Sequence, residues 1–351
     1  MSLFLSRISK LSFLGWVLSF FSDLVCLTGL QGEEYARFFS SLPESSPYLL
    51  LSSEKLGETC EGSETVRQKL FDPRKEETVN GSEKTLPKEL EGDILVGASK
   101  GWVLSMDKKD SSLHLTDLCK PWVSSSPRVM SLPSLGFDPC VTVKQVSLSS
   151  SSPDECTVAA NFTSDLMYSK RDNAFYFASN KGLYMGSLHL SSNKLKYQEL
   201  RFSSLPKFPE AEWEMLDTCF MSKHFVESPS GELFFVKWYR QFLHKENNNN
   251  GRREVEDIHS KTRRFMVFRQ DDNTKALSYT QDIGDLCIFL GKSEAFCLSA
   301  SLYPGLKPNS IYYIGSGLGS YHLPSGTVRP YNPLGSPKTL HAPFWLDPIS
   351  S

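Results

Sequence analysis

From Asp93 onward, short runs of β-branched and aromatic residues alternate with turns rich in glycine, proline, asparagine and serine. The first group reads as a strand at Ile94–Ala98, a tight turn at Gly101, a strand at Trp102–Met106, a charged turn and a strand at Leu113–Thr116. Glycine supplies turns that need positive φ, while β-branched and aromatic side chains fill the pleated, half-buried surface of a sheet. Because no long helical period interrupts these runs, the sequence predicts an all-β fold of small antiparallel strands.

The same order of strands and turns returns three more times, in residues 174–200, 219–240 and 311–331. Repeated meanders of this size are typical of a β-propeller, whose blades take roughly 40–50 residues each. Residues 93–348 are therefore predicted to form a kelch-like propeller of about six blades. An irregular β-sandwich or β-barrel is the alternative that the pattern leaves open.

Residues 1–30 are predicted to be an organelle-targeting segment. Residues 1–22 carry Arg7 and Lys10, several serines and no acidic residue, a composition typical of a transit peptide. The apolar run Phe13–Phe21 behind this basic start also resembles the core of a secretory signal, although no clean small-x-small cleavage site follows it. The run is shorter than the roughly 20 apolar residues that cross a bilayer. Import into an organelle is favoured, and secretion or no import stay open.

Two polar segments stand apart from the strand-like runs. Residues 31–92 are interpreted as a lead-in and charged linker that holds a first strand or two, because their apolar residues are scattered. The segment Lys245–Asp257 is polar and of low complexity, and it is predicted to be a solvated loop between two strands. Basic residues near this loop could contact phosphate or RNA, but interleaved acidic residues and the lack of an aromatic platform argue against that.

The composition bounds the classes of function. With 40% hydrophobic and 22% charged residues, the 351-residue chain has the make-up of a soluble globular protein. A formal charge of -2 argues against a general binder of nucleic-acid phosphates, which normally carries a basic excess. The eight cysteines include no Cys-x-x-Cys and no Cys/His cluster with zinc spacing. We therefore expect no metal site and no nucleic-acid partner.

Cys287 and Cys297 would face each other if a three-residue hairpin formed at Gly291–Ser293. The chain is far less dense in cysteine than the small secreted domains that disulfides hold together. Most of its cysteines lie in apolar runs, where a free thiol behaves as a small hydrophobic group. The expectation is a reduced, buried pair, with a disulfide as the alternative.

Neither a phosphate-binding loop nor a dinucleotide fingerprint is complete. The run Gly291–Ser293 resembles the end of a phosphate-binding loop, but the position five residues earlier is Leu286, and a strand is expected to follow where a helix is needed. The glycine-rich turn Gly315–Gly319 lacks the last glycine and the following helix of a dinucleotide fingerprint. No cofactor-binding residue is predicted.

Catalytic motifs are also missing from the sequence. The seven histidines form no His-Glu-x-x-His, and no serine lies in a nucleophile elbow. His224 and Cys219 could pair for nucleophilic catalysis, but nothing marks an oxyanion hole or an orienting third residue. The other histidines near strands and three tryptophans are expected to be structural: His114, His189, His322, Trp213, Trp238 and Trp345. No catalytic residue is predicted.

The amino-acid sequences of several stretches resemble those of one plant family. These stretches are Ile94–Trp102, Asp165–Asp172, Glu212–Asp217, Val226–Glu232 and Asp285–Ile314. They are similar to the family called domain of unknown function 295, the KIB-type β-propeller family, and the resemblance extends over residues 47–346. Many relatives carry an F-box ahead of the propeller and are thought to act as substrate receptors of ubiquitin ligases. A separate branch lacks the F-box and begins with an organelle-import peptide; the chain is similar to that branch, particularly at Arg263–Arg269 and Tyr279–Gly284.

Two details of the chain qualify the resemblance. The residues between an import peptide and Pro47 are too few for the helical bundle of an F-box, so docking to a Skp-type adaptor is not expected. Relatives usually have extra strand-forming sequence between the equivalents of Phe162 and Leu166, whereas here Thr157–Phe162 passes almost directly into Asp165–Tyr168. The resemblance therefore implies one incomplete blade and leaves closure of the ring open.

The functional hypothesis is a non-enzymatic interaction protein, imported into mitochondria, that presents one face of a propeller to a protein partner. One rival keeps the protein in the cytosol or nucleus as an F-box-less relative of ubiquitin-ligase receptors. Another gathers catalytic residues from several blade loops on one face. A plastid location is the alternative to the mitochondrion, and neither a cofactor nor a membrane span is expected.

Overall fold

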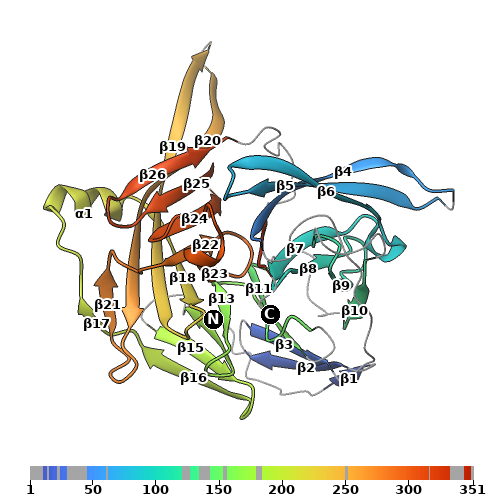
Figure 1. Cartoon of the computed structure of the whole chain (residues 1–351), viewed down its shortest axis with the longest axis horizontal. Helices are drawn as coiled ribbons and strands as arrows, with labels where there is room; N and C mark the ends of the chain where they lie inside the picture. Colours follow the sequence, from blue (N-terminus) through green and yellow to red (C-terminus); the bar gives the residue numbers. More distant parts are fainter. Residues whose placement is uncertain are drawn as a thin grey trace.

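The computed structural model describes residues 11–13, 16–21, 24–29, 46–60, 62–120, 127–133, 143–152, 156–178, 184–249, 252–315, 317–332 and 344–348. Within these ranges strands predominate, with one α-helix, α1 (Glu210–Asp217), and the 3-10 turns Lys88–Leu90 and Ala300–Leu302. The strands form six sheets around a common axis (Figure 1). The prediction of an all-β propeller is confirmed, and the sandwich and barrel alternatives are wrong.

Four of the six sheets each use one continuous piece of chain. The first contains β7 (Ile94–Ser99), β8 (Trp102–Met106), β9 (Leu113–Thr116) and β10 (Val129–Leu132). The second contains β13 (Leu166–Ser169), β14 (Ala174–Ala178), β15 (Tyr184–His189) and β16 (Lys194–Glu199). The third contains β17 (Phe202–Ser204), β18 (Phe220–Glu227), β19 (Leu233–Asn249), β20 (Arg252–Gln270) and β21 (Leu277–Thr280). The fourth contains β22 (Leu286–Leu290), β23 (Phe296–Ser299), β24 (Ser310–Gly315), β25 (Gly317–His322) and β26 (Thr327–Tyr331).

The fifth sheet joins strands from opposite ends of the sequence and closes the ring. Its strands are β27 (Phe344–Leu346), β4 (Tyr48–Glu58), β5 (Glu64–Asp72) and β6 (Glu77–Thr85), in that spatial order. The reading of residues 31–92 as a linker with a first strand or two is therefore corrected to three long strands. Register shifts between Leu50 and Ser52 and between Arg67 and Lys69 break the alternation of apolar residues, so the strand pattern was hidden.

The sixth sheet is a composite. Its strands from the described part of the propeller body are β11 (Gln145–Leu148) and β12 (Thr157–Asn161), and the outer strands β3 (Leu24–Gly29), β2 (Trp16–Phe21) and β1 (Leu11–Phe13) come from the N-terminal segment. The predicted count of about six blades is thus corrected to five self-contained blades and one composite sheet. The incomplete blade that the short passage before Leu166 implied is this sheet.

Buried apolar clusters lie between neighbouring sheets all the way around the ring. One joins β8 and β9 to β11 and β12 through Trp102, Leu104, Val146 and Val158. On its other side, the composite sheet packs against the β13–β16 sheet, and the β13–β16 sheet packs against the β17–β21 sheet. The β17–β21 sheet packs against the β22–β26 sheet. The closing sheet packs against the β22–β26 sheet on one side and against the β7–β10 sheet on the other. The described residues therefore form a closed ring, because each sheet buries both of its faces against a neighbour.

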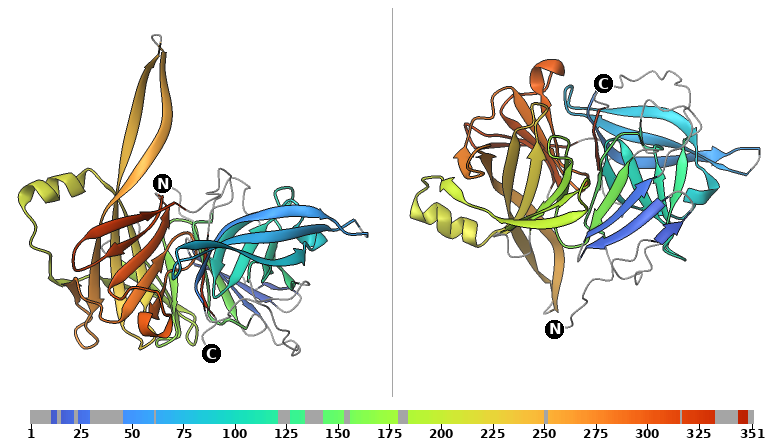
Figure 2. Two further views of the ribbon diagram at one scale, coloured as in Figure 1. Left: turned by 45° about the horizontal axis from the view of Figure 1, so that its top comes forward. Right: turned by 90° about the horizontal axis from the view of Figure 1, so that it is seen from below.

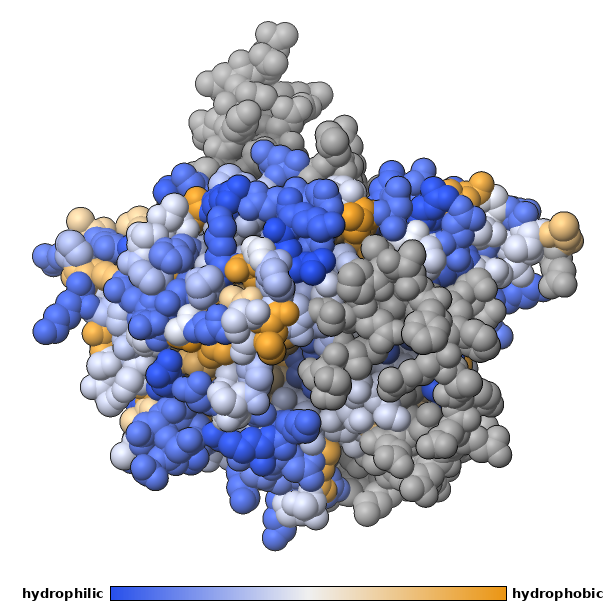
Figure 3. Space-filling view, viewed as in Figure 1, coloured by the Kyte–Doolittle hydropathy of each residue, from blue (hydrophilic) through white to orange (hydrophobic). Residues whose placement is uncertain are grey.

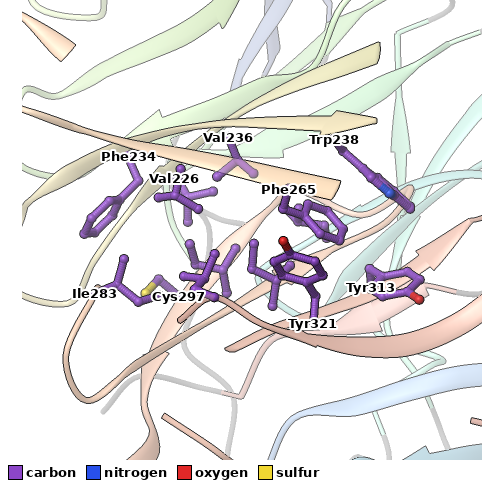
Figure 4. Close-up of a cluster of buried hydrophobic side chains, with 14 residues drawn as sticks. Val226, Phe234, Val236, Trp238, Phe265, Ile283, Cys297, Tyr313 and Tyr321 are labelled. Carbon is purple, nitrogen blue, oxygen red and sulfur yellow. The ribbon is translucent and has the colours of Figure 1, made fainter. Parts of the chain in front are cut away.

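The cluster between β18–β20 and β22–β25 shows how these interfaces are packed (Figure 4). Trp238 stacks on Phe265 with 5.3 Å between ring centroids, and the rings of Tyr313 and Tyr321 lie 5.4 and 5.2 Å from that of Phe265. Each such aromatic pair contributes about 0.5–1.5 kcal/mol beyond its buried area. The Trp238 indole N–H donates to the Thr262 hydroxyl at 3.1 Å, so no buried donor is lost. The predicted structural role of Trp238 is confirmed.

A long hairpin replaces the loop predicted at Lys245–Asp257. The pairing of β19 with β20 continues from Phe234↔Arg269 to Asn249↔Arg252, so the polar segment forms strands. This hairpin projects from the body in Figure 1 and in the left view of Figure 2. Its polar sequence misled the prediction, because a two-stranded ribbon has no buried face that would require apolar residues.

Candidate functional site

A cavity of about 640 Å³ lies inside the ring, and all six sheets contribute to its wall. Each sheet contributes a lining residue from its innermost strand or from the position directly after that strand. These six residues are Ser99, Ser149, Tyr168, Glu227, Phe296 and Trp345. Five of the six innermost strands end at the cavity, within one residue of these lining residues. The site is therefore assembled by the fold from residues that are far apart in the sequence.

Glu294 crosses between sheets at this cavity and is 7% exposed. Its carboxylate accepts hydrogen bonds from the Ser99 hydroxyl, from the Ser147 hydroxyl at 2.8 Å and from the Tyr168 backbone N–H at 2.7 Å. The Glu294 backbone N–H donates to the Ala98 carbonyl at 2.8 Å. One residue from the β22–β23 turn thus ties together the innermost strands β7, β11 and β13. A buried carboxylate needs such donors to replace water, and this one has them.

A tight turn places Lys100 at the cavity. Lys100 and Gly101 have φ of 48° and 75°, and they join β7 to β8 between the paired residues Ser99 and Trp102. Two consecutive positive φ values make this a type I′ turn, which matches the twist of the two strands. The Lys100 ammonium lies 5.6 Å from the centroid of the Tyr168 ring, a cation–π contact between neighbouring parts of the wall.

Two ionisable groups stand next to this turn, the buried Lys120 and the half-buried Asp347. Burial raises the pKa of Asp347 to about 7; Lys100 lowers it, Glu294 raises it and Lys120 lowers it. Burial also lowers the pKa of Lys120 to about 8, while Asp117 acts in the opposite direction. The Lys120 ammonium lies 4.4 Å from the Trp102 ring. The wall of the cavity therefore contains a carboxyl group that changes charge near neutral pH.

Asp347→Asn is expected to become more stable relative to the wild type as the pH rises. The folded protein keeps the Asp347 proton up to about pH 7, whereas the carboxyl of the unfolded chain ionises near pH 4. The stability that this proton contributes is complete below the unfolded pKa and is lost as the pH rises through the folded pKa. Because water reaches Asp347 in part, we expect the variant to gain about 1–2 kcal/mol on the wild type between pH 4.5 and pH 8. Urea unfolding of both proteins at several pH values measures the gain, and parallel curves would contradict it.

The turn at Gly291–Ser293 and the two cysteines beside it, Cys287 and Cys297, lie in the β22–β23 hairpin. Gly291–Ser293 lies in a turn between two strands, and the strand β23 follows it, as predicted, where a phosphate-binding loop needs a helix. That turn runs over residues 291–295, longer than the three-residue hairpin predicted. Cys287 pairs with Leu298 and Cys297 with Ile288, so the two thiols point to opposite faces of the sheet and do not face each other. Both cysteines are free and buried, as expected.

The histidines near strands have local partners. His114 Nδ1 lies 2.9 Å from Asp93, His189 lies 3.4 Å from the Ser187 hydroxyl, and His322 lies 2.9 Å from the Ser325 hydroxyl. These local partners fit the structural or surface roles expected for the three histidines. Trp345 is buried and its indole N–H donates to the Leu290 carbonyl at 3.1 Å, and Trp213 packs on the cluster beside β18, so both tryptophans are also structural.

His224 does not pair with Cys219. Its Nε2 lies 3.0 Å from the Ser222 hydroxyl and its Nδ1 lies 2.8 Å from Asp165 Oδ2, the order of groups found in serine hydrolases. Asp165 Oδ2 nevertheless lacks the alignment of a hydrogen bond, and Ser222 does not line the cavity. Because Asp165 precedes β13 and His224 lies in β18, we interpret the contact as a tie between adjacent sheets. The Cys219 thiol instead donates to the Met215 carbonyl at 3.4 Å.

Sequence reasoning did not find Glu294, Lys100 or Asp347. The sequence predicted a turn at Gly101, but Lys100 reaches the cavity only because the sheets close into a ring. Among the described residues no group of three His, Cys, Asp or Glu side chains is placed to hold a metal ion. No helix in the described part of the chain has the length and apolar character needed to cross a bilayer.

Comparison with known proteins identifies a family. No curated protein matches the chain. Among solved structures, a similar chain comes from the complex structure of the fission yeast SREBP-SCAP binding domains, with 10% identity over 76% of this chain and 67% of that chain. Its TM-score of 0.16 is too low to bear on fold or function. A profile of the KIB1-4 beta-propeller matches residues 70–332, three quarters of the chain, and the protein therefore belongs to the KIB1-4 beta-propeller family.

Proposed function

We propose that this propeller is a non-enzymatic interaction module whose central cavity receives a segment of a protein partner in the mitochondrion. The observation that carries the proposal is a cavity of about 640 Å³ whose wall is shared by all six sheets. Pockets of about 300–1,000 Å³ hold drug-sized ligands, and a short peptide segment has a similar bulk. A rigid ring can hold such a site in shape while its turns supply the specific contacts.

Two ammonium groups at the cavity favour a partner segment with acidic and apolar side chains side by side, since the lining carboxylates of Glu294 and Glu227 already accept hydrogen bonds. Lys100 and Lys170 both line the cavity, and Lys170 is exposed on the turn after β13. Leu302 also lines it and is 72% exposed, so an apolar group is available next to the two ammonium groups. Figure 3 shows one face of the ring as mostly hydrophilic, with small separate apolar patches. Protein interfaces likewise combine an apolar centre with a polar, charged rim.

The carboxylate of Glu294 supports binding over catalysis. Both of its oxygens already accept hydrogen bonds from neighbouring strands, so the group holds the ring together and has little capacity left for proton transfer. The basic, acid-free start of the chain, with Arg7 and Lys10, supports import into mitochondria.

Proximity labelling in intact plant cells, by the wild type and by the double variant Lys100→Glu/Lys170→Glu, tests the partner and the compartment together. We expect the wild type to label mitochondrial proteins and the double variant to lose at least one strongly labelled protein by about tenfold, because two attractive charges become repulsive. Lys196→Glu is the matched control, since Lys196 is exposed on the outermost strand β16, away from the cavity. Equal labelling by all three proteins would contradict the binding site. Labelling of cytosolic ubiquitin-ligase adaptors would contradict the mitochondrial assignment.

A further inference from the structure

The composite sheet contains too few strands from the propeller body to be stable alone. Among the described residues of the range 46–348, β11 and β12 are its only strands, whereas the four one-piece sheets have four or five strands each. A two-stranded unit is marginally stable at best in water, and at least three strands are normally needed. This sheet also carries part of two interfaces in the ring, through Val146 and Val158 on one side and Ala159 on the other.

The N-terminal segment supplies the strand that β12 lacks. β3 pairs antiparallel with β12 along its whole length, from Thr157↔Thr28 to Asn161↔Leu24. β3 in turn pairs with β2 from Trp16↔Gly29 to Phe21↔Leu24. With β3 in place all five residues of β12 are buried, and without β3 the outer edge of β12 would present unpaired N–H and C=O groups.

We propose that the outer edge of β12 is a strand-acceptor site, and that the occupant of this site in the folded protein is the chain's own β2–β3 hairpin, residues 16–29. The recognition is that of β-strand addition, in which main-chain hydrogen bonds bind an extended segment to an open sheet edge. Residues 30–47 lead from β3 to β4, and a fully extended chain of this length reaches about 60 Å, far enough to pass the intervening sheet. The apolar composition of Trp16–Phe21, part of the run that is otherwise typical of a signal core, then follows from its place in a sheet.

The proposal limits how the chain can be processed. Removal of residues 1–30 on import would remove the hairpin and open the edge of β12 to another strand. Removal of the basic start up to Lys10 would leave the hairpin in place. The hairpin therefore belongs to the mature protein, and any cleavage falls before Trp16.

A single substitution tests the register of this pairing, because the added strand β3 already has a cysteine opposite β12. Cys26 is the direct partner of Ala159. Residues directly opposite each other in antiparallel strands share a face, at Cα separations of about 4.5–5.5 Å, which disulfides bridge. In the intact chain, mild oxidation of Ala159→Cys is expected to link the new thiol to Cys26 within one molecule. Peptide mapping by mass spectrometry under non-reducing conditions identifies the link.

Ala160→Cys is the matched control. Ala160 is the partner of Val25, so a thiol at this position points to the other face of the sheet from Cys26. The link in Ala159→Cys should form at least about tenfold faster than any link in the control. Equal rates, or no link in either protein, would overturn the proposal. A link between two molecules, seen as a dimer on a non-reducing gel, would overturn the assignment of the hairpin to its own chain.

A second pair keeps the test open if Ala159→Cys does not fold. Leu27→Cys combined with Val158→Cys places two thiols at the adjacent register position, and Cys26→Ser removes the native thiol. The same intramolecular link is expected between positions 27 and 158, and its absence in a folded protein would overturn the proposal.

Discussion

Glu294→Ala is expected to destabilise the protein by about 3–5 kcal/mol. The change leaves the Ser99 and Ser147 hydroxyls and the Tyr168 backbone N–H without their shared acceptor. The hydroxyls can rotate toward other acceptors, whereas the backbone N–H of Tyr168 cannot. The loss is measured as a shift of the urea midpoint in chemical unfolding.

Two further variants separate the charge from the side-chain bulk. Glu294→Gln keeps the shape and one acceptor oxygen, so it should lose less than the alanine variant. Glu227→Ala is the matched control, because Glu227 also lines the cavity but makes one partly solvent-exposed contact, with the Arg171 N–H at 3.2 Å. It is expected to cost less than about 1 kcal/mol. If Glu294→Ala were as stable as this control, the carboxylate would not hold the innermost strands together.

Gly305→Ala is expected to destabilise the protein by about 3 kcal/mol, because strain and a backbone clash coincide. Gly305 has a φ of 102°, and an added Cβ would lie 2.6 Å from the carbonyl oxygen of Arg74. Arg74 belongs to the turn between β5 and β6 and is held by its ion pair with Asp72 at 2.6 Å, so this backbone has little room to move. The contact joins the sheet of β22–β26 to the closing sheet of the ring. Thermal or urea unfolding measures the loss.

Gly317→Ala is the control for strain alone. Gly317 has a φ of 90°, and an added Cβ would meet nothing within 4 Å. Its substitution should cost about 1 kcal/mol. Equal losses for the two alanine variants would mean that the contact between Gly305 and Arg74 contributes nothing to closing the ring.

Local rules predicted the strands of the one-piece blades well. Leu113–Thr116 was predicted and is β9, and the turn at Gly101 lies where glycine and the preceding lysine adopt positive φ. These features depend on neighbours in the sequence, through alternation of apolar residues and the turn preference of glycine. The same rules also predicted the buried tryptophans, because large aromatic residues inside strand-like runs rarely stay exposed.

The remaining features depend on long-range pairing, which one sequence does not reveal. Glu294 looks like an ordinary turn residue until the ring brings Ser147 and Tyr168 to it from positions more than 100 residues away. The pairing of Cys26 with Ala159 likewise has no local signal, so the apolar start of the chain suggested only a targeting segment. In the β19–β20 hairpin, polar residues form strands because backbone pairing alone holds the two together.

Hydrogen–deuterium exchange of the intact chain, alone and with the partner found by proximity labelling, tests most directly that the cavity of this propeller binds a protein segment. The account predicts slower exchange on binding in the turns around Ser99–Gly101, Ser149–Ser151, Lys170 and Ser228, which line or border the cavity. Protection confined to the projecting hairpin or to the outer strand β16, with these turns unchanged, would contradict it.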